Sequence, residues 1–195
     1  MAELINIAYG RAAASLSELT RQKISLEAPK LELYPLAEVR PALHQLYDQE
    51  VWSVHQIFSG GMSGHAILLV DEKSAQTLGE QVLHEQAGSL DAEALQDVLR
   101  EIGNIVLQAA LGICGELLHF KVAFAVPGLR VDTLGSMLSS MLVEEAELQY
   151  ALMVRTKFQI LSKHVSGNMV VVLGVTSFNR LIEATNDWEK RLSGP

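Results

Sequence analysis

The chain has 195 residues, of which 49% are hydrophobic, which suits one compact domain or two small halves that share a core. Its formal net charge of −8 argues against a nucleic-acid-binding protein, because such a protein needs a basic face to neutralise phosphates. The single cysteine, Cys114, excludes an internal disulfide and lies in an apolar helical pattern, so we expect a buried thiol. Residues 1–20 lack a signal-peptide pattern and no apolar run approaches about 18 residues, so we expect a cytoplasmic protein without a membrane span.

Helix and strand patterns follow one another in the first half of the chain. The expected elements are a helix over 2–21, an extended segment over 24–36, strands over 51–58 and 65–70, and a helix over 74–86. Pro29 limits the ladder hydrogen bonds of the extended segment, and Ser74 is a plausible cap of the helix that follows the strands. The Gly-rich stretch 59–64 lacks the ending of a phosphate-binding loop and no helix follows it directly, so it indicates a hairpin turn.

The second half predicts a similar order of elements. These are a helix over 91–118, a strand over 120–126, a short helix over 132–141, strands over 148–160 and 168–175, and a last helix over 177–185. Asp91 is expected to cap the long helix, with Glu93 in the first turn, where a carboxylate is favourable. Residues 187–195 form a polar tail that we expect to be frayed.

The two halves also match residue by residue. A shift of 98 positions aligns Glu3 with Glu101 and gives nine identities in 29 positions, where unrelated sequences would give roughly two. A shift of 103 matches the later parts of the halves, namely Ser63-Gly64 with Ser166-Gly167 and Ser74 with Ser177. We therefore expect one domain, 1–195, made of two repeats, about 1–88 and 91–186, that are related by a pseudo-twofold axis.

The long helix around Glu101 has an apolar and a polar face. Its apolar residues recur at steps of three and four, so this face is expected to pack on the core: Leu95, Val98, Leu99, Ile102, Ile105, Val106 and Ala109. Asp97, Glu101, Asn104 and Gln108 recur at steps of four, three and four residues. At about 100° per residue, these four side chains are expected to stand in one line along the solvent face.

A Glu-x-x-Asn pair occurs once in each half. Glu101 and Asn104 are three residues apart, which places a carboxylate and an amide side by side on a helix, and Glu3 and Asn6 repeat this spacing. In both copies a proline follows the Asn after 23 positions. Because Asn is a mediocre helix former, its place in both helices indicates a function. An amide carries a donor and an acceptor, so it can hold a water molecule in a chosen orientation, while the Glu can bind a cationic group of a partner.

The string Asp97-x-x-x-Glu101-x-x-Asn104, followed by Pro127, resembles the signature of the CheC/CheX/FliY family of chemotaxis phosphatases. Glu3-x-x-Asn6 resembles the N-terminal copy of the same motif, and two copies in one chain are most similar to the two-site CheC branch. The resemblance covers nearly the whole chain, from about residue 3 to residue 185. It implies an α/β (α+β) fold of pseudo-twofold duplicated halves, with a central antiparallel sheet flanked by helices.

The resemblance also implies hydrolysis of the aspartyl phosphate of a CheY-like receiver domain. Asn6 and Asn104 would orient the attacking water, Glu3 and Glu101 would bind the receiver's active-site lysine, and Asp97 would have a supporting role. The Mg²⁺ that coordinates the phosphate would belong to the receiver, so this chain is expected to need no cofactor of its own. The first copy departs from the family pattern, since bulky Tyr9 stands where members often have Ala, and the second copy is therefore the stronger candidate.

Other interpretations of these residues stay open at this point. One is a scaffold without catalysis that binds a receiver, a CheD-like protein or a flagellar switch component, and another is an unrelated interaction domain with a chance motif. A metal site is not expected, because the histidines lack metal-ligand spacing: His44, His55, His65, His84, His119 and His164. Trp52, Met137 and Met141 are expected to pack in the core, and Glu144, Glu145 and Glu147 to form a solvated connection.

Overall fold

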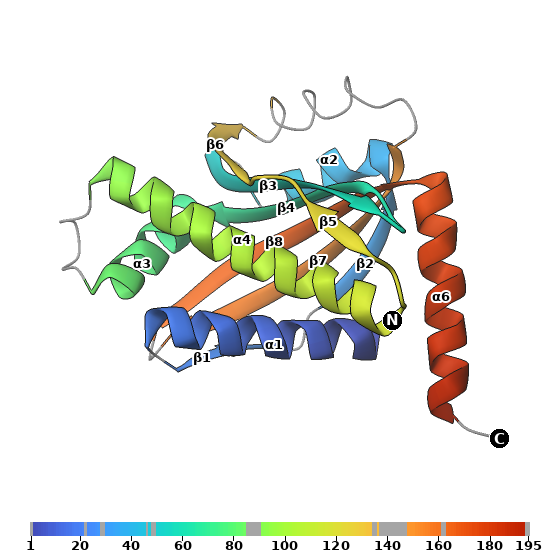
Figure 1. Ribbon diagram of the computed structural model, residues 1–195. Coiled ribbons are helices and arrows are strands. Elements are labelled where there is room, and N and C mark those ends of the chain that lie inside the picture. The colour runs from blue at the N-terminus through green and yellow to red at the C-terminus, as the bar shows by residue number, and fades with distance from the viewer. Residues whose placement is uncertain are drawn as a thin grey trace.

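The computed structural model in Figure 1 describes residues 2–193, except 22, 28–29, 46, 48–49, 85–90, 134–135, 137–147 and 161–162. Its helices are α1 (Ala2–Thr20), α2 (Leu36–His44), α3 (Glu72–Leu83), α4 (Ala92–Leu117) and α6 (Val175–Ser193). Its strands are β1 (Ile24–Leu26), β2 (Lys30–Pro35), β3 (Glu50–Gly60), β4 (Gly64–Asp71), β5 (Val122–Phe124), β6 (Gly128–Thr133), β7 (Leu148–Ile160) and β8 (Lys163–Gly174). Apart from α2, which lies between β2 and β3, the order helix, two short strands, two long strands, helix therefore occurs twice.

These strands form one antiparallel sheet. Its order is β1-β7-β8-β4-β3-β5, with β2 also paired to β7 and β6 also paired to β3. The order is the same from either end when the halves are exchanged, so a pseudo-twofold axis passes between β4 and β8, which pair directly. The expected α+β fold, with duplicated halves around a central antiparallel sheet, is confirmed.

The strand register corrects one part of the alignment between the halves. Leu26 pairs with Phe158, while Phe124, which lies 98 positions after Leu26, pairs with Phe58. Strands β3 and β7 therefore correspond at a shift of 100 residues. Since Phe58 pairs with Gly64 and Phe158 pairs with Val165, strands β4 and β8 correspond at a shift of 101.

The shift of 103 that matched Ser63-Gly64 with Ser166-Gly167 is therefore wrong within the strands. The ladder hydrogen bonds fix the register, and the two small residues beside the first hairpin turn do not. The shift of 103 does hold for Ser74 and Ser177, because α3 and α6 begin at Glu72 and Val175.

Helices cover both faces of the sheet. On one face, α1 and α4 lie side by side (Figure 1), and they share the larger core with residues of α3 and α6. On the opposite face, α2 covers a smaller core, in which Val39 and Leu43 pack with Ile67 and Val170. By length and composition α4 is apolar enough to cross a membrane, but 12 of its residues are buried within this fold, as in a core helix.

Three elements differ from the expectation. Helix α2 was missed because Pro41 lies within it, and proline usually ends a helix. Strand β6 runs to Thr133, so the short helix expected from Asp132 does not begin there; most of its remaining residues lie outside the described range. The cap of α3 is Asp71 rather than Ser74, because Asp71 Oδ1 accepts a hydrogen bond from the Ser74 backbone N–H at 2.7 Å.

The expected frayed tail is also wrong for most of its length. Helix α6 continues to Ser193, and Trp188 is only 8% exposed. Leu181, Thr185 and Trp188 are buried and recur at helical spacing, so one face of this polar helix packs on the fold.

Candidate functional site

Helix α4 crosses strand β3 at close range beside the second Glu-x-x-Asn pair. The helix begins as expected, with the Asp91 side chain accepting a hydrogen bond from the Ala94 backbone N–H at 2.8 Å. Gly103 allows the crossing, because a Cβ at this position would lie 2.5 Å from the Cβ of Val54 in β3. The next residue, Asn104, is thereby brought within hydrogen-bonding reach of the sheet.

The side-chain oxygen of Asn104 accepts two hydrogen bonds. Gln56 of β3 is fully buried and donates from Nε2 over 3.2 Å, and Gln108 of α4 donates from Nε2 over 2.6 Å. Gln56 Nε2 also donates to the backbone carbonyl of Ala125 over 2.9 Å. The amide of Asn104 is therefore held from the sheet and from its own helix.

Asp97 and Glu101, the other two polar residues in line with Asn104 and Gln108 on α4, lie at the surface. Glu101 and Asp97 are exposed, whereas Asn104 and Gln108 are partly buried, so the expected solvent face holds for only half of the line. Asp97 Oδ1 accepts a hydrogen bond from Arg100 Nη1 at 2.6 Å, in an ion pair of exposed side chains that contributes at most about 1 kcal/mol. Asp97 thus interacts with its own helix, and Glu101 is the exposed carboxylate next to Asn104.

The N-terminal pair lies on the neighbouring helix. Glu3 and Asn6 are exposed on α1, which is linked to α4 by an ion pair of 2.8 Å between Arg11 and Glu116. Tyr9 is 2% exposed, and burial raises the pKa of its phenol. The Tyr9 side chain therefore lies in the core and not on the surface beside Asn6.

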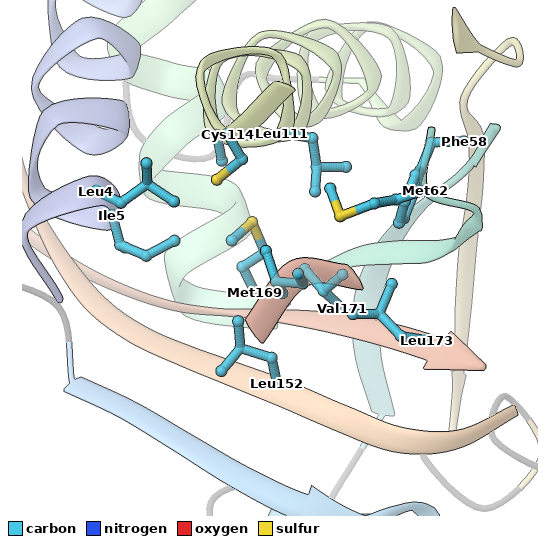
Figure 2. Close-up of a pocket in the computed structure, with 12 residues that line it drawn as sticks. Leu4, Ile5, Phe58, Met62, Leu111, Cys114, Leu152, Met169, Val171 and Leu173 are labelled. Carbon is cyan, nitrogen blue, oxygen red and sulfur yellow. The ribbon is translucent and has the colours of Figure 1, made fainter. Parts of the chain in front are cut away.

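Cys114 is buried, as expected, and lines a small apolar cavity between α1, α4 and the sheet (Figure 2). The cavity has a volume of about 20 Å³, and Leu4 and Met169 also line it. Because its walls offer almost no polar partners, we do not expect ordered water in it. Burial raises the pKa of the Cys114 thiol to about 12, so the thiol stays protonated and packs as a small apolar group.

The remaining residues singled out in the sequence are the histidines, Trp52, two methionines and an acidic run. Among the described residues, no group of three or more His, Cys, Asp or Glu side chains is arranged to hold a metal ion. His55 and His65 stack on neighbouring strands, with 2.8 Å between Nε2 of the first and Nδ1 of the second. Trp52 is buried, as expected, and its indole donates a hydrogen bond to Glu72. The side chains of His164, Met137, Met141, Glu144, Glu145 and Glu147 lie outside what the structure describes.

Gln56 and Ala125 are site residues that the sequence analysis missed. Gln56 alternates with Val54 and Phe58 on the face of β3 that packs against α4. An amide at an inward position of an apolar strand is the signal that could have revealed it, because buried polar groups need partners. Ala125 lies two positions before Pro127, and its backbone N–H donates to the Ile57 carbonyl over 2.9 Å, which fixes this segment beside Gln56.

The structure thus defines a class of protein with two Glu-x-x-Asn helices side by side on a duplicated antiparallel sheet. No protein-family model matches the chain. Over 194 residues, the chain is 24% identical to the CheY-P phosphatase CheC of Bacillus subtilis (strain 168), and the match covers 93% of this chain and 90% of that protein.

Two solved structures have a similar fold. Thermotoga maritima FliY superposes with a TM-score of 0.76 and 17% identity, over 95% of this chain and 93% of that chain. A chain of the CheX-CheY-BeF3-Mg²⁺ complex from Borrelia burgdorferi superposes with a TM-score of 0.54 and 15% identity, over 87% of this chain and 97% of that chain. Together with the sequence match, these similarities support the CheC/CheX/FliY family that the motifs resemble.

Proposed function

We propose that this chain hydrolyses the aspartyl phosphate of a CheY-like receiver domain, with Glu101 and Asn104 as its principal site. The observation that carries the proposal is the geometry of Asn104, whose amide is held by two hydrogen bonds beside an exposed carboxylate. The similarity to a CheY-P phosphatase over almost the whole chain supports this reaction, and a CheX-CheY complex among the structural neighbours supports a receiver as partner.

In the proposed reaction a water oxygen forms a bond to phosphorus while the bond from phosphorus to the receiver's aspartyl oxygen breaks. The products are inorganic phosphate and the free aspartate carboxylate, and the proton of the water passes to phosphate or solvent. An amide cannot act as a base, so Asn104 contributes by holding the water in line for attack. Glu101 binds the lysine ammonium of the receiver and fixes the docked orientation.

The proposal assigns the Mg²⁺ to the receiver, where it coordinates the phosphoryl group, and assigns no cofactor to this chain. The proposed reaction takes place in the cytoplasm. Glu3 and Asn6 form the first copy of the same pair, on α1, with the same roles. A CheD-like protein is a further partner that the family resemblance suggests.

The proposal predicts that Asn104→Ala slows dephosphorylation of the receiver at least tenfold, because water loses its positioning group. The assay follows the decay of a phosphorylated CheY-like receiver with wild-type chain, Asn104→Ala, Asn6→Ala and the double variant. Gln96→Ala is the matched control, since it removes an exposed amide of the same helix. Unfolding temperatures of all variants check that the fold survives.

A receiver lifetime that the wild-type chain leaves unchanged would contradict the proposal. If the chain binds the receiver equally well after both asparagines are replaced, and never shortens the lifetime, it is a scaffold instead. Binding is measured with the receiver in its BeF3-activated form, so that hydrolysis does not interfere.

A further inference from the structure

Gln56 is the buried amide that decides how Asn104 is oriented. Its Nε2 lies 2.9 Å from the carbonyl oxygen of Ala125, an atom that only accepts hydrogen bonds. The atom of Gln56 on this side must therefore be the donor Nε2. The same Nε2 lies 3.2 Å from Asn104, so the atom of Asn104 that faces it must be the acceptor Oδ1.

Gln108 supports the same orientation from within α4. Its Nε2 lies 2.6 Å from Asn104 Oδ1, one helical turn away. With two donors on Oδ1, the Nδ2 hydrogens are the part of the Asn104 amide that is left for water or substrate. A water that accepts a hydrogen bond from Nδ2 keeps a lone pair for attack on phosphorus.

At the first site, formed by Glu3 and Asn6, other residue types stand at the positions of both glutamines. Gly10 stands on α1 at the position that corresponds to Gln108, and a Cβ there would meet no atom within 4 Å. In the strand register β7 corresponds to β3 at a shift of 100, so Thr156 stands at the position of Gln56. Asn6 itself is exposed, whereas Asn104 is partly buried.

We propose that Gln56 and Gln108 are positioning residues that turn the Asn104 amide with Nδ2 outward, and that the Asn6 site works more slowly because it lacks them. This inference rests on the proposed phosphatase function and adds the cause of a difference between its two sites. In the proposed arrangement neither glutamine contacts the receiver, because both act through Asn104.

The test measures kcat and KM for a phosphorylated CheY-like receiver in an Asn6→Ala background, where only the second site is left. Gln56→Met and Gln108→Met keep the length of each side chain and remove its amide. We expect kcat to fall between roughly tenfold and a hundredfold for Gln56→Met, with KM changed less than twofold, as for a catalytic group that loses its orientation. In an Asn104→Ala background, the same substitution should have no further effect on kcat.

A gain of function at the Asn6 site is a second, independent test of the same inference. In an Asn104→Ala background, Gly10→Gln should raise the remaining rate severalfold, because the open space at Gly10 admits the side chain. Gly10→Ala is the control, since it improves the helix without adding an amide.

The results separate the two proposals. A wild-type kcat in Gln56→Met and Gln108→Met, together with a large loss in Asn104→Ala, would overturn the positioning role and leave the phosphatase function standing. A wild-type chain that does not shorten the receiver lifetime would overturn both. A Gln56→Met variant that lowers kcat equally with and without Asn104 would show an effect on the fold and refute positioning through Asn104.

Discussion

The close approach of Gly103 to Val54 predicts that alanine affects the stability of the protein differently at two glycines of α4, Gly103 and Gly112. A Cβ at Gly103 would lie 2.5 Å from Val54 Cβ, whereas a Cβ at Gly112 would meet no atom within 4 Å. Replacing a helical glycine by alanine stabilises a helix by about 1 kcal/mol. Gly112→Ala should therefore stabilise the protein by about this amount.

At Gly103 the same gain is opposed by overpacking, which typically costs about 1–3 kcal/mol. The two variants should therefore differ by about 1–3 kcal/mol in the free energy of unfolding. For a chain of this size, that is a difference of about 2–12 °C in Tm. Gly103→Ala should also slow the proposed phosphatase reaction, because moving α4 away from β3 lengthens the hydrogen bond between Gln56 and Asn104.

Urea unfolding followed by tryptophan fluorescence is a suitable assay, since Trp52 and Trp188 are each only 8% exposed. An unchanged m-value would show that the difference belongs to the native state. If Gly103→Ala and Gly112→Ala gave the same stability, the close crossing of α4 over β3, and the explanation of how Asn104 reaches Gln56, would be refuted.

Two further predictions concern a helix cap and the pH dependence of stability. Asp71→Ala should lower the free energy of unfolding by about 1 kcal/mol, because the Ser74 N–H and hydroxyl both lose an acceptor. Urea unfolding measures this change, and an unchanged midpoint would refute the role of Asp71 as the cap of α3. Burial raises the pKa of the Cys114 thiol from its ordinary value of 9.0 to about 12, so folding favours the protonated form. The contribution of the protonated thiol to the free energy of unfolding is complete below about pH 9. It is lost as pH rises toward 12, at up to about 1.4 kcal/mol per pH unit. The fall in stability between pH 8 and pH 11 should therefore be shallower in Cys114→Ala, and equal slopes in the two proteins would contradict it.

Helices α1 and α4 were predictable because their signals are local. The apolar period of α4 and the cap at Asp91 lie within a few residues of one another, and both are confirmed. Helix α2 was missed because Pro41 is a breaker by the usual rule, although Val39 and Leu43 bury one face of this helix. Strand β6 was missed although Leu129-Arg130-Val131-Asp132 alternates apolar and polar residues, because this alternation extends over only four positions.

In the candidate site, too, one part is predictable from local sequence and another part is not. Glu101 and Asn104 are three residues apart, so their proximity follows from helix geometry alone. Gln56 lies 48 residues from Asn104 and 69 residues from Ala125, so only the tertiary fold brings these groups together. Sequence analysis therefore identified the pair that would meet a partner, but not the groups that orient it.

The comparison of α1 with α4 explains why a symmetric fold need not have two equal sites. At the shift of 98, buried residues match buried residues: Leu4 with Ile102, Ala8 with Val106, Tyr9 with Leu107, Ala12 with Ala110, and Leu16 with Cys114. A core position mainly requires apolar volume, so different side chains can satisfy it in the two halves. Orienting an amide requires a donor at a particular place, and Gly10 cannot supply what Gln108 supplies. The duplicated core can therefore persist while the two Glu-x-x-Asn pairs differ in how firmly they are held.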